Sequence, residues 1–405
     1  MKEIHADNIR NIAIAGHAGS GKTSLTEALL FLSGAIDRLG KVADGNTASD
    51  FDPEEIKRKI SVSSFLAPME WKDTKVNVID TPGLFDFAGG FYEGMRPVES
   101  VLMVVSGKSG VAVGTEKAYR EAVNTNRCRA FFVNKLDTEN ADFYKVFGLL
   151  KAEFGSSVCP LVIPVMDGET VSCYINLIDR KAYAYHNGNA SEVPMPDTGH
   201  QMEELVSAMS EAVAETDESL FEKYFSGEQF TKEELIDGLR KGVKSGSITP
   251  VFCGSAVTME GVDLLLDGLT SLLPSAGASD GETGYNAAGD IVEIRCDEKG
   301  PLCAIIFKTV ADPFVGKMSF FKVVGGKMTT DVTPYNLRTD STERIGKLLF
   351  LRGKKQQETD VVVAGDIGVV TKLDKTVTGD TLSTQAHPLR LEGSVFPVPN
   401  LTMAI

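Results

Sequence analysis

A glycine-rich segment near the start of the chain, Gly16 to Thr23, ends in a lysine and a hydroxyl side chain. It reads Gly16-His17-Ala18-Gly19-Ser20-Gly21-Lys22-Thr23 and fits the pattern G-x-x-x-x-G-K-[ST]. Glycines let the backbone curl so that several N–H groups point inward, an arrangement that suits phosphate oxygens. Lys22 would reach the β- and γ-phosphates of a nucleotide, and the Thr23 hydroxyl would hold Mg²⁺.

The residues on either side favour a phosphate site over a glycine-rich turn without a ligand. Asn11 to Ala15 is a short apolar run that predicts a buried strand, and Ser24 to Leu32 has helical periodicity. A strand, a glycine-rich turn and a helix N-terminus together form the context that an anion site requires.

Three more motifs lie at the ends of predicted strands. Asp80-Thr81-Pro82-Gly83 offers Asp80 to Mg²⁺ through water and the Gly83 N–H to the γ-phosphate. In Asn134-Lys135-Leu136-Asp137, the Asp137 carboxylate can accept both guanine N1–H and N2–H₂, a donor pair that adenine lacks. Ser255-Ala256 can supply a backbone N–H to guanine O6. Ligands of open α/β sheets bind at strand ends, so the motifs together predict a site for GTP or GDP.

The polar, weakly periodic segment from Asn46 to Lys59 is expected to be the first switch, ordered by the γ-phosphate and Mg²⁺. Ser61 is the candidate Mg²⁺ ligand that follows it. An ordinary strand serine is the alternative reading of this residue.

The order of predicted elements indicates an α/β domain followed by an all-β domain. Strands alternate with helices, which implies a mostly parallel sheet with helices on both faces. Residues 157–247 interrupt this pattern with short strands and acidic helices and are predicted to be an insert. The predicted strands of this first part cover 61–66, 74–80, 98–106, 129–134 and 249–253, and its helices cover 115–126, 142–154 and 262–273.

The second part of the chain is separated from the first by a small, polar segment, 275–290, which predicts a linker. Short β-type runs between glycine, proline and aspartate turns follow, and they predict an antiparallel barrel. The apolar last residues, 396–405, look like the start of a strand, so we expect the chain to be part of a longer protein.

Composition narrows the class of protein. The 405 residues are 42% hydrophobic and 24% charged, which is typical of a globular protein, and no apolar run is long enough to span a membrane. The net charge of −15 argues against non-specific binding to nucleic acid over the whole surface. Six scattered cysteines without a C-x-x-C pair favour reduced thiols. We expect a cytoplasmic monomer that binds neither membrane nor DNA.

In combination, these motifs resemble elongation factor G and the elongation factor G-like subgroup. The barrel motifs Ala311 to Lys317, Ala364 to Gly368 and Thr378 to Leu382 share the likeness. The resemblance implies a P-loop GTPase domain over 1–274 with the insert at 157–247, the linker 275–290, a translation-factor β-barrel over 291–390, and at 391–405 the start of a third domain. It also implies the ribosome, with its rRNA and proteins, as a partner.

Three residues differ from the family pattern. Ser61 replaces the switch threonine and keeps its hydroxyl, whereas Gly19 replaces an aspartate thought to serve a monovalent cation. Leu84 replaces the histidine that orients the attacking water, and leucine cannot hydrogen-bond a water. The expected catalytic positions are Lys22, Gly83 and Leu84. The expected nucleotide-binding residues are Gly16, His17, Ala18, Gly19, Ser20, Gly21, Lys22, Thr23, Ser24, Asp80, Gly83, Asn134, Lys135, Asp137, Ser255 and Ala256, and the expected Mg²⁺ residues are Thr23, Ser61 and, through water, Asp80.

We therefore expect a ribosome-binding factor that hydrolyses GTP, slowly because of Leu84, to drive or regulate a step such as translocation. One alternative is a GTP-controlled regulator or ribosomal protection factor that acts by occupancy. Another is a GTPase without a ribosomal role.

Overall fold

A computed structural model describes residues 4–312, 315–352 and 355–398. Its central feature is a seven-stranded sheet in the order β2-β3-β1-β4-β5-β11-β6. All neighbouring strands run parallel except β2 and β3, which form an antiparallel pair. The strands are β1 (Ile9–Ala15), β2 (Phe65–Trp71), β3 (Thr74–Asp80), β4 (Ser100–Ser106), β5 (Cys128–Asn134), β6 (Val158–Pro160) and β11 (Thr249–Cys253).

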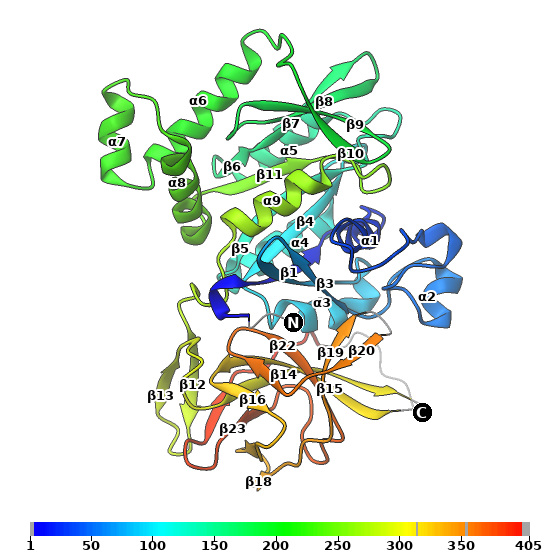
Figure 1. Ribbon diagram of the computed structural model, residues 1–405, viewed down its shortest axis with the longest axis vertical. Coiled ribbons are helices and arrows are strands. Elements are labelled where there is room, and N and C mark those ends of the chain that lie inside the picture. Colours follow the sequence, from blue (N-terminus) through cyan, green and yellow to red (C-terminus); the bar gives the residue numbers. More distant parts are fainter. Residues whose placement is uncertain (1–3, 313–314, 353–354, 399–405) are drawn as a thin grey trace.

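Helices cover both faces of this sheet, as predicted for an α/β domain (Figure 1). On one face α1 (Lys22–Leu32) packs against α9 (Val262–Leu272). On the other face, α4 (Val113–Asn124) and α5 (Phe143–Phe154) meet over β5, where the rings of Tyr119, Phe131 and Phe154 stack with centroids 4.3 to 6.0 Å apart. The strands are buried on both faces, which explains their nearly continuous apolar sequences.

The predicted insert forms the upper part of the molecule (Figure 1). It contains an antiparallel sheet in the order β10-β9-β8-β7 and three helices. Its first strand, β6, instead joins the edge of the main sheet beside β11. The other elements are β7 (Val162–Asp167), β8 (Thr170–Asn176), β9 (Lys181–His186), β10 (Asn189–Val193), α6 (Gln201–Ala214), α7 (Glu218–Phe225) and α8 (Lys232–Ser245).

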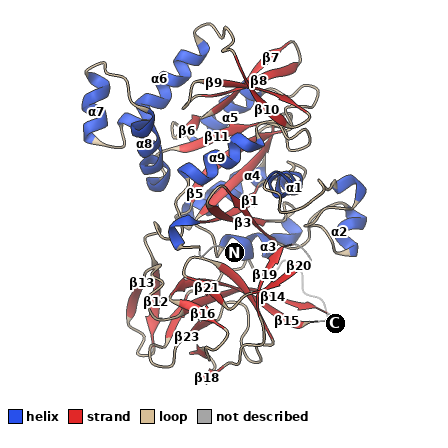
Figure 2. Cartoon of the chain, in the orientation of Figure 1, coloured by secondary structure: helices blue, strands red, loops and turns tan. Residues whose placement is uncertain are grey.

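The lower part of the molecule consists of antiparallel strands, as expected of a barrel (Figure 2). Its eight-stranded sheet has the order β18-β17-β23-β14-β15-β22-β19-β20. These strands are β14 (Cys303–Asp312), β15 (Gly316–Gly325), β17 (Tyr335–Asn336), β18 (Ser341–Thr342), β19 (Leu348–Arg352), β20 (Lys355–Glu358), β22 (Ile367–Thr371) and β23 (Thr381–Ser383). Two smaller sheets complete it, one of β16 (Lys327–Thr329) and β21 (Val361–Val363), the other of β12 (Glu282–Asn286), β13 (Ile291–Ile294) and β24 (Leu389–Leu391).

The segment between the two domains differs from the prediction. The expected linker 275–290 contains the strand β12, which pairs with β13 and β24. Its small residues permit this pairing, because a Cβ on Gly284 would lie 3.0 Å from the Arg390 carbonyl oxygen. At the other end, Leu391 belongs to β24, and the described residues after it, up to Val398, form no strand. The expected start of a third domain, 391–405, thus lies partly on these residues and partly on residues 399–405, which are outside the described residues.

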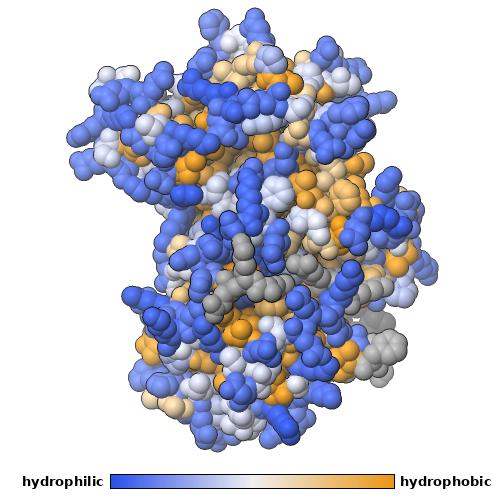
Figure 3. Space-filling view, viewed as in Figure 1, coloured by the Kyte–Doolittle hydropathy of each residue, from blue (hydrophilic) through white to orange (hydrophobic). Residues whose placement is uncertain are grey.

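On the face shown in Figure 3, hydrophilic residues cover much of the insert and of the lower domain, with hydrophobic residues between them. Among the described residues, no helix is both long and apolar enough to cross a membrane.

Buried ion pairs join the two domains. Lys75 Nζ lies 2.7 Å from Asp366 Oδ2, and both side chains are under 5% exposed. Asn77 donates to the other oxygen of Asp366 at 3.0 Å. A second pair joins Lys322 of the lower domain to Glu99. Paired buried charges of this kind favour one relative position of the two surfaces, because a shift within the interface would leave each charge buried without its partner.

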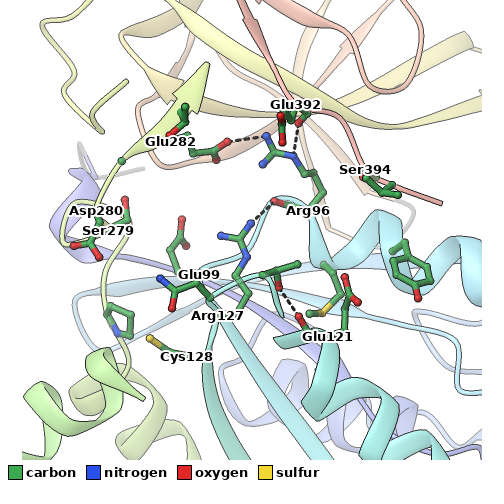
Figure 4. A pocket seen from close by; sticks show the side chains of 18 of the residues that line it. Arg96, Glu99, Glu121, Arg127, Cys128, Ser279, Asp280, Glu282, Glu392 and Ser394 are labelled. Atoms are coloured by element: carbon green, nitrogen blue, oxygen red, sulfur yellow. Dashed lines mark hydrogen bonds and ion pairs between the residues drawn. The ribbon is translucent and has the colours of Figure 1, made fainter. Parts of the chain in front are cut away.

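The linker is tied to the α/β domain beside a cavity of about 480 Å³ (Figure 4). Arg96 pairs with Glu282 at 2.7 Å and donates to the Glu392 carbonyl, while Arg127 donates to the Arg96 carbonyl. Burial alone would raise the pKa of Glu282, but Arg96 and Lys322 hold it at about 2. The starts of strands β4 and β5 lie at this cavity, whereas the glycine-rich loop follows the last residue of β1. The cavity and the loop therefore lie at opposite ends of the parallel strands.

We predict that Lys75→Met lowers the free energy of unfolding by about 3–5 kcal/mol, because Asp366 would keep a buried charge without its cation. Urea unfolding followed by circular dichroism measures this change. Lys181→Met is the matched control, since the ion pair of Lys181 with Glu192 is about half exposed. Equal shifts in the two variants would contradict a stabilising role for the buried pair.

Candidate functional site

The glycine-rich loop connects β1 to α1, as the sequence predicts. Gly16 and Gly21 have φ angles of 133° and 96°, which a residue with a side chain rarely adopts. A Cβ on Gly16 would lie 2.5 Å from the Val104 carbonyl oxygen, so there is no room for one. Lys22 folds back over the loop and donates to the carbonyls of Gly16 and His17 at 3.1 Å. The loop is thus curled around a cavity with a buried ammonium group beside it.

This cavity has a volume of about 220 Å³ and gathers residues from segments far apart in the chain. Ten of the predicted residues line it: Ala18, Gly19, Gly21, Lys22, Thr23, Ser24, Ser61, Gly83, Leu84 and Lys135. Four residues that the sequence did not single out also line it: Val42, Asp50, Lys59 and Ile60.

Hydroxyl and carboxylate groups meet at one corner of the cavity. Thr23 Oγ1 donates to Asp80 Oδ2 at 2.9 Å and lies 3.0 Å from Ser61 Oγ. Ser61 Oγ in turn donates to Asp50 Oδ1 at 2.9 Å. The remaining oxygens, Asp80 Oδ1 and Asp50 Oδ2, are buried and have no hydrogen-bond partner in the described structure. This donor set of unsatisfied carboxylate oxygens and hydroxyls suits Mg²⁺.

Asp50 is the residue at this corner that the sequence reasoning missed. It lies in the polar segment from Asn46 to Lys59, which also contains Asp52, and nothing in the sequence distinguishes the two aspartates. Only the folded segment shows which carboxylate turns inward.

The titration behaviour of the corner follows from its burial. Burial raises the pKa of Asp80 to about 7 and that of Asp50 to about 6, against the opposing charge of Lys22. Burial likewise lowers the pKa of Lys22, against the opposing charges of the two carboxylates. A cation bound at the corner would favour the ionised carboxylates.

The segment expected to be a polar switch contains a short helix, α2 (Pro53–Arg58). Asp52 and Glu55 form a capping box around its first turn, with proline at the start. Glu55 is buried and accepts the N–H groups of Val62 and Ser63, so it also fixes the chain that follows. The sequence Asp-Pro-Glu-Glu carries this capping signal, which the periodicity did not reveal.

The lower domain contacts the chain just after this segment through a buried lysine. Lys308 of β14 donates to Ser63 Oγ at 2.6 Å, to Ser64 Oγ at 2.9 Å and to the Ser64 carbonyl. Its Nζ lies 3.9 Å from Glu93 on α3 (Ala88–Met95). The chain two and three residues after Ser61 is therefore held by both domains.

On the other side of the loop, Asn134 joins three of the predicted motifs. Its Nδ2 donates to the Ser20 carbonyl at 3.0 Å, and its Oδ1 accepts the Ala256 N–H at 3.0 Å. Lys135 Nζ donates to the Gly19 carbonyl. These contacts bring Asn134, Lys135 and Ala256 together as the sequence predicts.

The remaining base-site residues are placed differently from one another. Asp137 is exposed, and among the described residues its carboxylate makes no hydrogen bond, so it is available to a ligand. The Ser255 N–H donates to the Glu260 carbonyl at 2.9 Å, and the Ala256 N–H is bonded to Asn134. The structure thus differs from the expectation of a free N–H at Ser255-Ala256, because a buried amide oxygen such as that of Asn134 requires a donor.

Gly83 and Leu84, two of the expected catalytic positions, both line the cavity. A Cβ on Gly83 would lie 2.3 Å from Lys22 Nζ and 2.9 Å from the Ala18 nitrogen, so its backbone lies directly against the loop. Leu84 presents an aliphatic side chain to the cavity. The side chain of His17 does not line the cavity. Its Nδ1 is buried without a partner, and its ring lies 6.3 Å from that of Phe85.

Comparison with known proteins agrees with this geometry. Residues 7–275 match the family model of the elongation factor Tu GTP binding domain, and residues 301–385 match that of elongation factor G domain 2. The crystal structure of ttk003000868 from Thermus thermophilus is similar, with a TM-score of 0.87 and 31% sequence identity. The match covers 98% of this chain and 57% of that chain, so the present chain spans little more than half of that protein's length.

The first family model covers well over half of the chain and the second covers most of the lower domain. A GTP-binding domain of this kind implies guanine-nucleotide binding, in accord with the loop and the Asn134 contacts. The chain therefore belongs to the translational GTPases of the elongation factor G type, with an elongation factor Tu GTP binding domain followed by elongation factor G domain 2.

Proposed function

We propose that this protein is a cytoplasmic translation factor that binds the ribosome and hydrolyses GTP to drive or regulate a factor-dependent step such as translocation. The observation that carries the proposal is the buried corner of Thr23, Ser61, Asp50 and Asp80 beside Lys22, held in place partly by the lower domain through Lys308. A nucleotide site whose switch segment leads directly into residues held by domain 2 suits a factor in which the nucleotide controls an interaction surface.

In this proposal the hydroxyls of Thr23 and Ser61 hold Mg²⁺, and Asp80 and Asp50 hold it through water. When bound, Mg²⁺ would neutralise the negative charge that develops on the phosphate oxygens during hydrolysis. The unsatisfied oxygens of Asp50 and Asp80 support this assignment.

A water molecule in the cavity would attack the γ-phosphorus. The bond from that phosphorus to the bridging oxygen would break, which leaves GDP and inorganic phosphate. The proton of the water passes to the phosphate. Lys22 would stabilise charge on the phosphates, and the Gly83 N–H would bind a γ-phosphate oxygen. Leu84 offers no group that can orient the water.

Asp137 is proposed to select guanine, because its exposed carboxylate is free to accept the N1–H and N2–H₂ groups. We predict that Asp137→Asn weakens GTP binding and improves binding of xanthosine triphosphate, whose 2-oxo group pairs with the new amide donor. Titration with fluorescent nucleotides measures both affinities. An unchanged preference for guanine would mean that the base site lies elsewhere.

Leu84→His tests whether position 84 limits the chemical step. We predict that this variant hydrolyses GTP at least tenfold faster than wild type in a single turnover with ribosomes, since one positioned polar group commonly contributes about 10²–10³ in rate. Leu84→Met is the apolar control and should leave the rate unchanged. Equally fast hydrolysis by wild type and Leu84→His would contradict the prediction.

A regulator or protection factor that acts by occupancy is the second candidate, and the aliphatic Leu84 in the cavity favours it. Steady-state GTP turnover with and without ribosomes separates the two. Stimulation by ribosomes is expected for the translational GTPase. Co-sedimentation with ribosomes in a non-hydrolysable GTP analogue, without stimulated turnover, would favour occupancy, and absence of both would exclude a ribosomal role.

A further inference from the structure

One lysine in the nucleotide cavity has no role in the function proposed above. Lys59 follows α2 and lines the cavity together with Ser61, Gly83 and Leu84. Its side chain is exposed at this wall, and in the described structure its ammonium group forms no ion pair or hydrogen bond. The neighbouring cation Arg58 differs, because it pairs with Glu54 on the same helix.

The backbone of Lys59 has an unfavourable conformation. Its φ and ψ angles of 57° and 39° lie in the left-handed region, where a residue with a Cβ is disfavoured. Glycine is the residue that usually ends a helix in this way. A lysine at such a position retains strain that a glycine would relieve, and strained residues concentrate at functional sites.

Glu55 holds this conformation in place from both sides of Lys59. The Glu55 carbonyl accepts the N–H groups of Lys59 and Ile60, and its buried carboxylate accepts those of Val62 and Ser63. The chain therefore wraps around Glu55, and Lys59 leaves it on the side that faces the cavity. Lys59 therefore lines the same cavity as Ser61 and Gly83, the residues proposed to meet Mg²⁺ and the γ-phosphate.

The chemistry of this wall explains why a cation is useful there. Leu84 and Ile60 are apolar, and no hydrogen-bonding side chain is present at position 84. Phosphoryl transfer depends mainly on stabilising charge around the γ-phosphate, and a cation inserted from a neighbouring segment does so effectively. A flexible ammonium group can approach the phosphate oxygens without taking part in proton transfer.

We propose that Lys59 binds the γ-phosphate of GTP and stabilises its charge during hydrolysis, as a cation supplied in cis by the switch segment. The inference rests on the proposed GTPase function and assigns a residue to it. Because GDP lacks the γ-phosphate, Lys59 should contribute to the affinity for GTP and not to that for GDP.

The test uses three substitutions at Lys59 and one matched control. Lys59→Met removes the charge, Lys59→Arg keeps it, and Lys59→Gly removes it while relieving the backbone. Lys57→Met is the control, since Lys57 is an exposed lysine of the same helix, makes no ion pair in the described structure and does not line the cavity. Dissociation constants for GTPγS and GDP are measured at low and high salt, together with single-turnover hydrolysis in the presence of ribosomes.

We expect Lys59→Met and Lys59→Gly to bind GTPγS about tenfold more weakly at low salt, with unchanged GDP affinity and at least a tenfold loss in the single-turnover rate. Lys59→Arg and Lys57→Met should resemble wild type. A wild-type ratio of GTPγS to GDP affinity in Lys59→Met, or an equal loss in Lys57→Met, would overturn the assignment. If wild-type protein bound neither nucleotide, the proposed function itself would fail instead.

Discussion

Asp50 and Asp80 share one buried corner with Lys22, and this concentration of charge constrains the whole nucleotide site. Burying two carboxylates side by side is costly unless donors and cations compensate them. Thr23 and Ser61 supply one hydrogen bond each, yet one oxygen of each carboxylate stays without a partner. The loop, the end of β3 and the switch segment must therefore meet at one point, and a bound cation would complete the compensation.

The second domain takes part in this arrangement through charges that are also buried. Lys308 holds the chain just after Ser61, and Lys75 and Lys322 fix the two domains against each other. A lysine buried at such an interface loses its hydration, and this loss lowers the pKa of Lys308. The negative charge of Glu93 opposes that shift. A movement of the chain after Ser61 would disturb the contacts of Lys308 with Ser63 and Ser64, so these contacts link this segment to the second domain.

Much of the site could be predicted because its residues follow strands directly. Asp80 and Asn134 end β3 and β5, whose buried apolar sequences are easy to recognise, and parallel strands bring their carboxyl ends to one edge. The strand at 61–66 was predicted too early, since β2 begins at Phe65 and leaves Ser61 in the loop before it. The strand β12 was hidden in a segment of small polar residues, because its pairing with β24 depends on residues about a hundred positions away.

The sequence alone determined the class of ligand, because Lys22, Asp80 and Asp137 each belong to a short motif that follows a strand. Such a motif can be recognised from the residues next to it. It also identified Leu84 as the residue that lacks a hydrogen-bonding group. Only the tertiary structure decided that Asp50 accepts a hydrogen bond from Ser61, that Lys59 lines the cavity at the glycine-rich loop and that Lys308 holds the chain just after Ser61. These placements depend on burial and on contacts between distant segments, and neither leaves a periodic or spaced signal in the chain.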